Sequence, residues 1–275
     1  MHSTAHASEP VFGALLKAWR RTRRLSQLEA SLVCGLSQRH LSFIESGRSR
    51  PSREMVMRLA EGLEMPLRDC NGLLSAAGYA PHYRERSISA PEMGSVRRAL
   101  QMMLDHHEPY PAIVVNREWD LLMANQAMVR LLSLLGDLEA MWRRVAGDGP
   151  RNVLELTLHR DGLRPHIANL AEFASDLIYR TQREAAAARN ERLNAMLARL
   201  RADPELPSAW HEPDWTRPPA PVLPMVLAAG ERQLRLFTMI ATFGTPQDVT
   251  TDDLRVETFF PSDGDSEAML RALAD

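Results

Sequence analysis

Apolar residues recur at helical spacing through the first third of the chain. Between residues 12 and 77 they fall into five short stretches separated by polar or small residues. Ser26 and Ser37 stand just before two of these stretches, where a hydroxyl can cap the start of a helix. Gly35 and Gly47 follow the second and third stretches, where glycine is favoured at a helix end. The pattern therefore predicts five short helices with tight connections.

The pattern changes after residues 80–94, which contain two prolines and several charges and are expected to form a linker. A helix is expected at 94–106, and helical spacing returns after residue 125, its longest run being 166–200. The Pro- and Trp-rich residues 203–221 predict a loop or cover. Short apolar runs bounded by turn residues predict five strands, at 112–115, 121–124, 222–228, 233–243 and 254–260.

The fourth predicted strand, at residues 233–243, carries apolar side chains on both of its alternating faces. Such a strand is expected to lie centrally, covered on each side, or covered on one side and facing a pocket on the other. Residues 229–231 are expected to form the hairpin turn before it. Two strands, a helical middle and three more strands fit the order of a PAS-like fold, which holds small ligands between its sheet and helices.

The chain has 275 residues and a net charge of −2, but the charge is unevenly spread. Residues 1–87 hold 13 Lys and Arg against 8 Asp and Glu, and the remainder is acidic. A basic first third suits a nucleic-acid-binding module, although chance asymmetry is an equal alternative. Cys34 and Cys70 are far apart, which favours neither a zinc site nor a disulfide. The absence of a long apolar run and of a signal sequence predicts a cytoplasmic protein that does not enter a membrane.

Residues 25–46 carry the most specific functional signal. For the second of two short helices to enter the major groove of DNA, the pair must cross closely, which requires small side chains between them and a tight turn. Ala30 and Cys34 are such small residues, and Gly35 supplies the turn. The third helix then exposes hydrogen-bonding side chains at its start, where base edges are read. These are Gln38, Arg39, His40 and Ser42.

Residues 12–78 resemble the phage-repressor-like, or XRE-type, helix-turn-helix family. In that family glutamines open the second and third helices, as Gln27 and Gln38 do here. The resemblance implies that Gln27 binds a phosphate and braces Gln38, and that Gln38 reads a base, adenine being the usual partner. It also implies a structural ion pair between Arg20 and Glu45.

The resemblance further places a basic loop against the DNA backbone or minor groove. The expected DNA contacts are Gln27, Ser37, Gln38, Arg39, His40, Ser42, Arg48 and Arg50. Two core positions depart from the family, since Ala30 stands where leucine is usual and Ser31 where alanine is usual. Leu28 and Leu32 are the candidates to compensate. A helical bundle that binds a protein instead of DNA is the alternative interpretation.

Nearly the whole chain resembles a narrower group of bacterial regulators, in which an MmyB-like ligand-binding domain follows this helix-turn-helix. The stretches that carry the resemblance are 37–69, 73–81, 114–128, 161–169 and 243–263. The resemblance implies a PAS-like sensor domain that binds a fatty-acyl or similar apolar ligand. Ordinary core packing is the competing interpretation for the apolar candidates, and a surface ion pair for the one arginine. The expected ligand contacts are Trp119, Leu121, Arg164, Phe173, Leu177, Phe237, Met239 and Phe243.

These interpretations define an α+β chain. Its expected parts are a disordered tail at 1–10, an all-α five-helix DNA-binding domain at 11–79, a linker at 80–94, and a PAS-like MmyB-type domain with a roughly five-stranded antiparallel sheet at 95–275.

The predicted function is that of a transcription regulator that binds specific double-stranded DNA as a homodimer and responds to a small apolar ligand. The alternative is a constitutive repressor whose C-terminal domain only dimerises or binds a protein partner. Catalysis, metals and cofactors are not expected, because the chain has no phosphate-binding or nucleophile motif and its histidines form no convincing metal triad.

Overall fold

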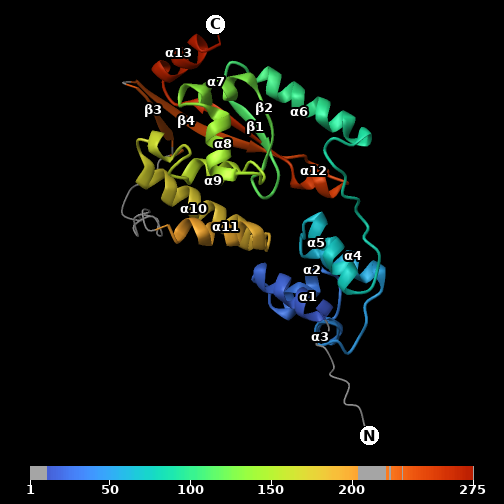
Figure 1. Cartoon of the computed structure of the whole chain (residues 1–275). Coiled ribbons are helices and arrows are strands. Elements are labelled where there is room, and N and C mark those ends of the chain that lie inside the picture. The colour runs from blue at the N-terminus through green and yellow to red at the C-terminus, as the bar shows by residue number, and fades with distance from the viewer. Residues whose placement is uncertain (1–10, 204–220, 223, 231, 275) are drawn as a thin grey trace. The chain divides into compact units, whose positions relative to one another are not determined.

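Five short helices form the first part of the chain (Figure 1). The computed structural model describes residues 11–203, 221–222, 224–230 and 232–274, so the expected disordered tail at 1–10 lies outside the described residues. The facing sides of the helices bury one apolar core, centred on Leu16, Trp19 and Leu59. The predicted five-helix arrangement is confirmed. The helices are α1 (Val11–Thr22), α2 (Gln27–Val33), α3 (Gln38–Glu45), α4 (Arg53–Gly62) and α5 (Leu67–Ala76).

Serine hydroxyls cap the start of α2, α3 and α4. The Ser26 hydroxyl accepts from the Glu29 N–H, and the Glu29 carboxylate accepts from the Ser26 N–H, which is a reciprocal capping box. Ser37 and Ser52 accept from one backbone N–H each. Gly35 has a φ of +65°, a conformation that side-chain-bearing residues rarely adopt, and it forms the corner between α2 and α3.

The first 86 residues do not complete the helical unit, because Pro246–Asp252, from much later in the chain, also belong to it. Here α12 (Val249–Asp253) begins. The Asp252 carboxylate accepts from the backbone N–H of Leu67, the first residue of α5, at 2.9 Å. The N-cap of α5 is a proline with no side-chain cap bond. A carboxylate from the later stretch therefore satisfies a free N–H at the start of α5.

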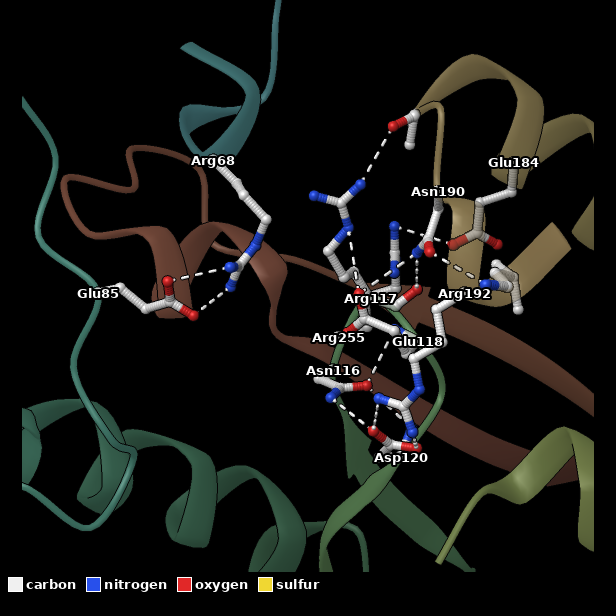
Figure 2. Close-up of polar contacts among 12 residues, drawn as sticks. Arg68, Glu85, Asn116, Arg117, Glu118, Asp120, Glu184, Asn190, Arg192 and Arg255 are labelled. Carbon is white, nitrogen blue, oxygen red and sulfur yellow. Dashed lines mark hydrogen bonds and ion pairs between the residues drawn. The ribbon is translucent and has the colours of Figure 1, made fainter. Parts of the chain in front are cut away.

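Residues 80–86, expected to belong to a linker, pack on the end of the helical unit. The side-chain amide of Asn71 donates to the Tyr83 carbonyl at 2.7 Å, and its oxygen accepts from the backbone N–H groups of residues 82 and 83. Arg68 of α5 forms a two-pronged ion pair with Glu85 (Figure 2). These contacts extend the helical unit to residue 86.

The second unit, called the sheet unit here, contains residues 87–245 and 253–274. Its five strands are antiparallel in the order β2-β1-β5-β4-β3, which confirms the predicted sheet. The first two strands have the predicted bounds, and the others lie within three residues of them. The strands are β1 (Ala112–Val115), β2 (Leu121–Ala124), β3 (Met225–Ala229), β4 (Arg232–Ala241) and β5 (Arg255–Pro261).

The helices of the sheet unit agree with the sequence pattern except in the longest run. The run predicted at 166–200 is two helices, because Arg189 adopts a φ of +49° and Asn190 caps a new helix by accepting from the Leu193 N–H. Of the predicted cover at 203–221, residues 204–220 lie outside the described part. The helices are α6 (Gly94–His106), α7 (Gln126–Leu134), α8 (Leu138–Ala146), α9 (Val153–Leu158), α10 (Leu170–Ala187), α11 (Glu191–Arg201) and α13 (Gly264–Ala272), with 3-10 turns at Pro91–Met93 and Arg164–His166.

Alternate residues of the strands face two different cores. On one face Ala112, Val114 and Val256 pack against Leu100 and Leu104 of α6. On the other face Ile113, Val115 and Phe259 join the apolar sides of α7 to α11 in a larger core. Figure 1 shows α6 on one side of the sheet and α8 to α11 on the other. The larger core is the one that contains a cavity.

Candidate DNA-binding surface and ligand cavity

The start of α3 turns hydrogen-bonding side chains outward. Gln38 and Arg39 are exposed, while His40 and Ser42 are half-buried. Leu41 and Ile44, on the opposite side of the same helix, are buried in the core of the helical unit. The helix therefore presents a polar edge, as a helix that enters the major groove must.

A buried ion pair holds α1 against α3. The Arg20 guanidinium donates two hydrogen bonds to the Glu45 carboxylate, at 2.6 and 3.0 Å, which confirms the predicted structural pair. The side-chain amide of Gln27 donates to the same carboxylate at 2.8 Å, so its described hydrogen bond goes to Glu45 and not to Gln38. Burial by itself raises the pKa of Glu45, but the hydrogen bonds from Arg20 and Gln27 and the nearby positive charges outweigh it and lower that pKa.

The basic loop after α3 contains two exposed arginines with different contacts. Arg48 is exposed and lies over the Phe43 ring, 5.9 Å from its centre, while Arg39 lies 5.3 Å from the same ring. Arg50 donates to the Ala77 carbonyl at 3.2 Å and lies over the Tyr79 ring. Arg50 therefore also supports the fold of the helical unit, whereas Arg48 lies outside the core.

The two departures from the usual core of α2 are accommodated without a leucine. Ala30 and Ser31 are buried, and the Ser31 hydroxyl donates to the Leu28 carbonyl at 2.7 Å, so its polar group is satisfied. Leu28 and Leu32 do not compensate, because their side chains are 52% and 69% exposed. They lie on the outer side of α2.

A cavity of about 120 Å³ lies inside the sheet unit, between the sheet and helices α7 to α10. Most of the described residues around it are apolar, as in sites that bind small molecules. Five of the eight predicted ligand contacts line it, namely Trp119, Leu121, Phe173, Leu177 and Phe237. The remaining apolar wall includes Met128, Leu131, Leu132, Trp142, Leu154, Leu156, Met225, Leu227, Leu236 and Phe259.

Three predicted ligand contacts lie elsewhere. Arg164 forms an ion pair with Asp203 at 2.9 Å. An ion pair is the alternative interpretation of this arginine, in place of a ligand contact. Met239 is 59% exposed, and Phe243 packs against the α6 core on the other face of the sheet. Along β4 the cavity is lined by Leu236, Phe237 and Thr238, and Met239 and Phe243 come after this stretch.

A polar network holds the turn between β1 and β2 in which Trp119 adopts a φ of +68°. Asn116 accepts from the backbone N–H groups of Glu118 and Asp120, each at 2.9 Å. The Asp120 carboxylate receives two hydrogen bonds from Arg192 of α11. These bonds hold the residues on both sides of Trp119, so its ring has a defined place in the cavity wall.

The network extends to the junction of α10 and α11. Arg117 donates to the Ala188 carbonyl at 3.1 Å, and Asn190 donates to the Arg117 carbonyl at 3.3 Å. Arg255 of β5 forms an ion pair with Glu184 of α10 at 2.9 Å (Figure 2). The break between the two helices is therefore part of the support of the cavity.

The cavity also has polar lining residues that the sequence pattern did not single out. Glu257 of β5 is buried there, and Asp176 and Arg180 reach it from α10. Burial raises the pKa of Glu257, against the opposing effects of the Arg180 charge and a hydrogen bond with Thr238. The available signal was an acidic residue within a largely apolar predicted strand, on the same alternating face as Phe259.

Within the described ranges, no group of three or more His, Cys, Asp or Glu side chains is placed to hold a metal ion. No helix in those ranges is both long and apolar enough to cross a membrane.

Together these features define a class of protein, in which a helix-turn-helix is joined to a separate unit with an internal apolar cavity. Comparison with known families identifies both parts. The family described as the MmyB-like transcription regulator ligand binding domain matches residues 96–273, and the helix-turn-helix family matches residues 16–70. The chain belongs to the MmyB-like transcription regulators and is a DNA-binding regulator with a ligand-binding domain. Comparison with curated proteins found no match.

Proposed function

We propose that the chain binds its operator as a homodimer and that a small apolar ligand in the cavity changes its affinity for DNA. The observation that carries this proposal is that one chain has both a mainly apolar cavity, in the sheet unit, and a polar, outward-facing α3, in the helical unit. One α3 of eight residues reaches only a few base pairs, and dimers of such proteins read two half-sites about one helical turn apart.

On the DNA side, α3 enters the major groove with its first turn against the bases. Gln38 makes two hydrogen bonds to an adenine, and Arg39, His40 and Ser42 lie close enough to read or bracket neighbouring bases. Ser37, Gln27, Arg48 and Arg50 contact phosphates. Support comes from the exposure of Gln38 and Arg39 and from the basic loop that follows α3.

On the ligand side, an apolar chain such as a fatty-acyl group fills the cavity. The strands β4 and β5 both contribute to the wall, through Thr238 and Glu257 among others, and the chain between them supplies Pro246–Asp252 to the helical unit. A ligand that moves these strands acts on the segment that caps α5. Such a ligand changes DNA binding only to the extent that it binds two conformations with different affinity.

The test begins with protein purified without detergent, extracted with organic solvent and examined by mass spectrometry for a bound apolar molecule. Lipid-stripped protein is then titrated onto operator DNA with and without saturated alcohols, methyl esters and acids of six to twelve carbons. We expect at least one of them to change the DNA dissociation constant by about 5-fold or more, in the range of ordinary allosteric coupling. No bound molecule and no change by any probe would overturn ligand control.

The alternative, a constitutive repressor whose sheet unit only dimerises, has one observation in its favour. Met102 and Met103 of α6 and Met239 of β4 are exposed apolar side chains of the sheet unit. If the sheet unit serves only as a dimer contact, substitution of Met102 and Met103 by lysine gives a monomer in analytical ultracentrifugation. Under the same alternative, the apolar probes leave DNA binding unchanged.

A further inference from the structure

Trp119, one of the residues that line the cavity, carries an unpaired hydrogen-bond donor. The side chain of Trp119 is 1% exposed, and its indole N–H has no acceptor among the described residues. Buried N–H groups without an acceptor are rare in folded proteins, and a bound atom is one way in which such a group is satisfied. The ligand is therefore expected to bring an acceptor, and an oxygen atom is the usual one.

The charges around the cavity restrict what kind of oxygen this can be. The described lining contains two carboxyl groups, those of Asp176 and Glu257, and one guanidinium group, that of Arg180. Arg180 lies over the Trp119 ring, 5.8 Å from its centre, and its charge acts favourably on Glu257. The single cation of the described lining is thus an exposed side chain of α10 that lies over an aromatic face and acts by its charge on Glu257.

Each charged head group conflicts with this arrangement. A carboxylate would be a third acidic group among the described lining residues, and beside the buried Glu257 it would oppose ionisation of that carboxyl group, because water screens like charges poorly there. An ammonium group has no lone pair for the Trp119 N–H and would add to the charge of Arg180. An alcohol or carbonyl oxygen accepts from Trp119 without adding charge, and a hydroxyl can also donate to a carboxyl oxygen.

The geometry points to an uncharged amphiphile with an alcohol or ester oxygen as the ligand, in preference to a free fatty-acid anion. This inference rests on the proposed function, since it takes the cavity as the ligand site. The oxygen lies against Trp119, between Glu257 and Arg180, and the hydrocarbon chain extends along Leu131, Leu156 and Leu236.

Cavity size guides the choice of probe. The cavity volume of about 120 Å³ is slightly below that of a 150 Å³ protein cavity that holds benzene, so a six-carbon chain is a suitable length. We would titrate the full, lipid-stripped chain at pH 8 with 1-hexanol, methyl hexanoate, sodium hexanoate and hexylamine. Ligand-observed NMR gives the dissociation constant of each. We expect hexanol and methyl hexanoate to bind at least 10-fold more tightly than hexanoate or hexylamine.

Two variants test the residues. Trp119→Phe keeps an aromatic ring and removes the N–H, and we expect it to weaken hexanol binding about 2- to 10-fold, the effect of one hydrogen bond. Glu257→Gln removes the acid and keeps its shape, and we expect it to strengthen hexanoate binding relative to hexanol. Glu139→Gln, at an exposed carboxylate of α8, is the matched control and should leave this ratio unchanged.

The outcomes separate this inference from the proposed function. Hexanoate binding as tight as hexanol binding, or an unchanged ratio in Glu257→Gln, overturns the assignment of the head group and leaves an apolar-ligand site in place. Binding by none of the four probes overturns the head-group assignment too. If, in addition, no molecule is extracted from the purified protein and no probe changes DNA binding, the proposed ligand control fails with it.

Discussion

Gln38 is exposed at the first turn of α3, a turn that Ser37 caps by accepting from the His40 N–H. A glutamine in this position can make two hydrogen bonds to adenine in the major groove. We expect Gln38→Ala to weaken operator binding by about 1–3 kcal/mol and to relax the base preference at one position in each half-site.

Fluorescence anisotropy with the operator and with single-base variants measures both effects. Gln101→Ala, the same substitution at an exposed site on α6, is the control and should bind as wild type does. If Gln38→Ala distinguishes the single-base variants as well as wild type does, the proposed orientation of α3 is wrong.

Glu45 is a buried residue at the end of α3 and holds this helix to α1 and α2 through Arg20 and Gln27. Because Arg20 and Gln27 both donate to its carboxylate, Glu45→Gln leaves a buried guanidinium without its counter-charge. We expect the variant to lose about 3 kcal/mol of unfolding free energy at pH 7. Urea unfolding measures this loss, with Glu54→Gln on the exposed side of α4 as the control.

The pH dependence of that loss has a defined sign. The folded state lowers the pKa of Glu45, so the carboxylate stabilises the fold above the ordinary glutamate pKa. The stabilisation disappears as the pH falls through the lower, folded-state value. The gap between wild type and Glu45→Gln should therefore narrow under acid conditions, and a gap that widens there would contradict this account.

The pKa of Glu257 is shifted in the opposite direction, so its effect on stability changes with pH in the opposite way. The pKa of Glu257 is raised by burial, so the folded state disfavours the carboxylate and loses stability as the pH rises toward the folded-state pKa. Glu257→Gln does not titrate. We expect the melting temperature of the variant to fall less than that of wild type between pH 5 and pH 8, as followed by scanning calorimetry of lipid-stripped protein.

At the scale of elements, the sequence pattern predicts most of the helices and strands, but not the break between α10 and α11 or the position of the cavity. The bounds of β1 and β2 could be predicted because short apolar runs end in turn residues. The break between α10 and α11 could not, because residues 185–188 are four alanines, which favour helix, and the break depends on Asn190 contacting a distant turn. Alternation along β4 indicates which residues point inward, yet core and cavity wall have the same apolar pattern.

Asn190 links two of these elements. Its side chain caps α11 and also donates to the Arg117 carbonyl in the turn that holds Trp119. We expect Asn190→Ala to cost about 1–2 kcal/mol of stability, the upper range for a lost cap, and to weaken binding of an apolar probe to the cavity. Asn194→Ala, at an exposed position one turn further along α11, is the control for both measurements.

The basic loop after α3 offers a comparison of two arginines. We expect Arg48→Ala to weaken binding to specific and non-specific DNA alike and to reduce the slope of log K against log salt by about one. Arg50→Ala should do the same and also lower the melting temperature, because Arg50 donates to the Ala77 carbonyl. An unchanged salt slope in both variants would place this loop away from the DNA.

At the scale of the whole molecule, the helical unit depends on a stretch of chain that lies between two strands of the sheet unit in the sequence. Asp252 satisfies the Leu67 N–H, and Asp248 pairs with Arg86 and accepts from the Thr250 N–H. We expect Asp252→Ala to cost about 1 kcal/mol and to speed amide hydrogen exchange at the start of α5. Asp265→Ala, in the exposed first turn of α13, is the control.

The divided construction of the helical unit also limits how such a protein can be cut and recombined. A chimera that joins the first 86 residues to another ligand-binding domain would lack Asp252, which accepts the hydrogen bond from the Leu67 N–H. The first turn of α5 would then be less stable. A fusion that uses the helical unit must therefore include residues 246–252, or join it to a domain that supplies a carboxylate at the same place. The same restriction applies when recombination between two such genes exchanges the segments that encode their N-terminal helices.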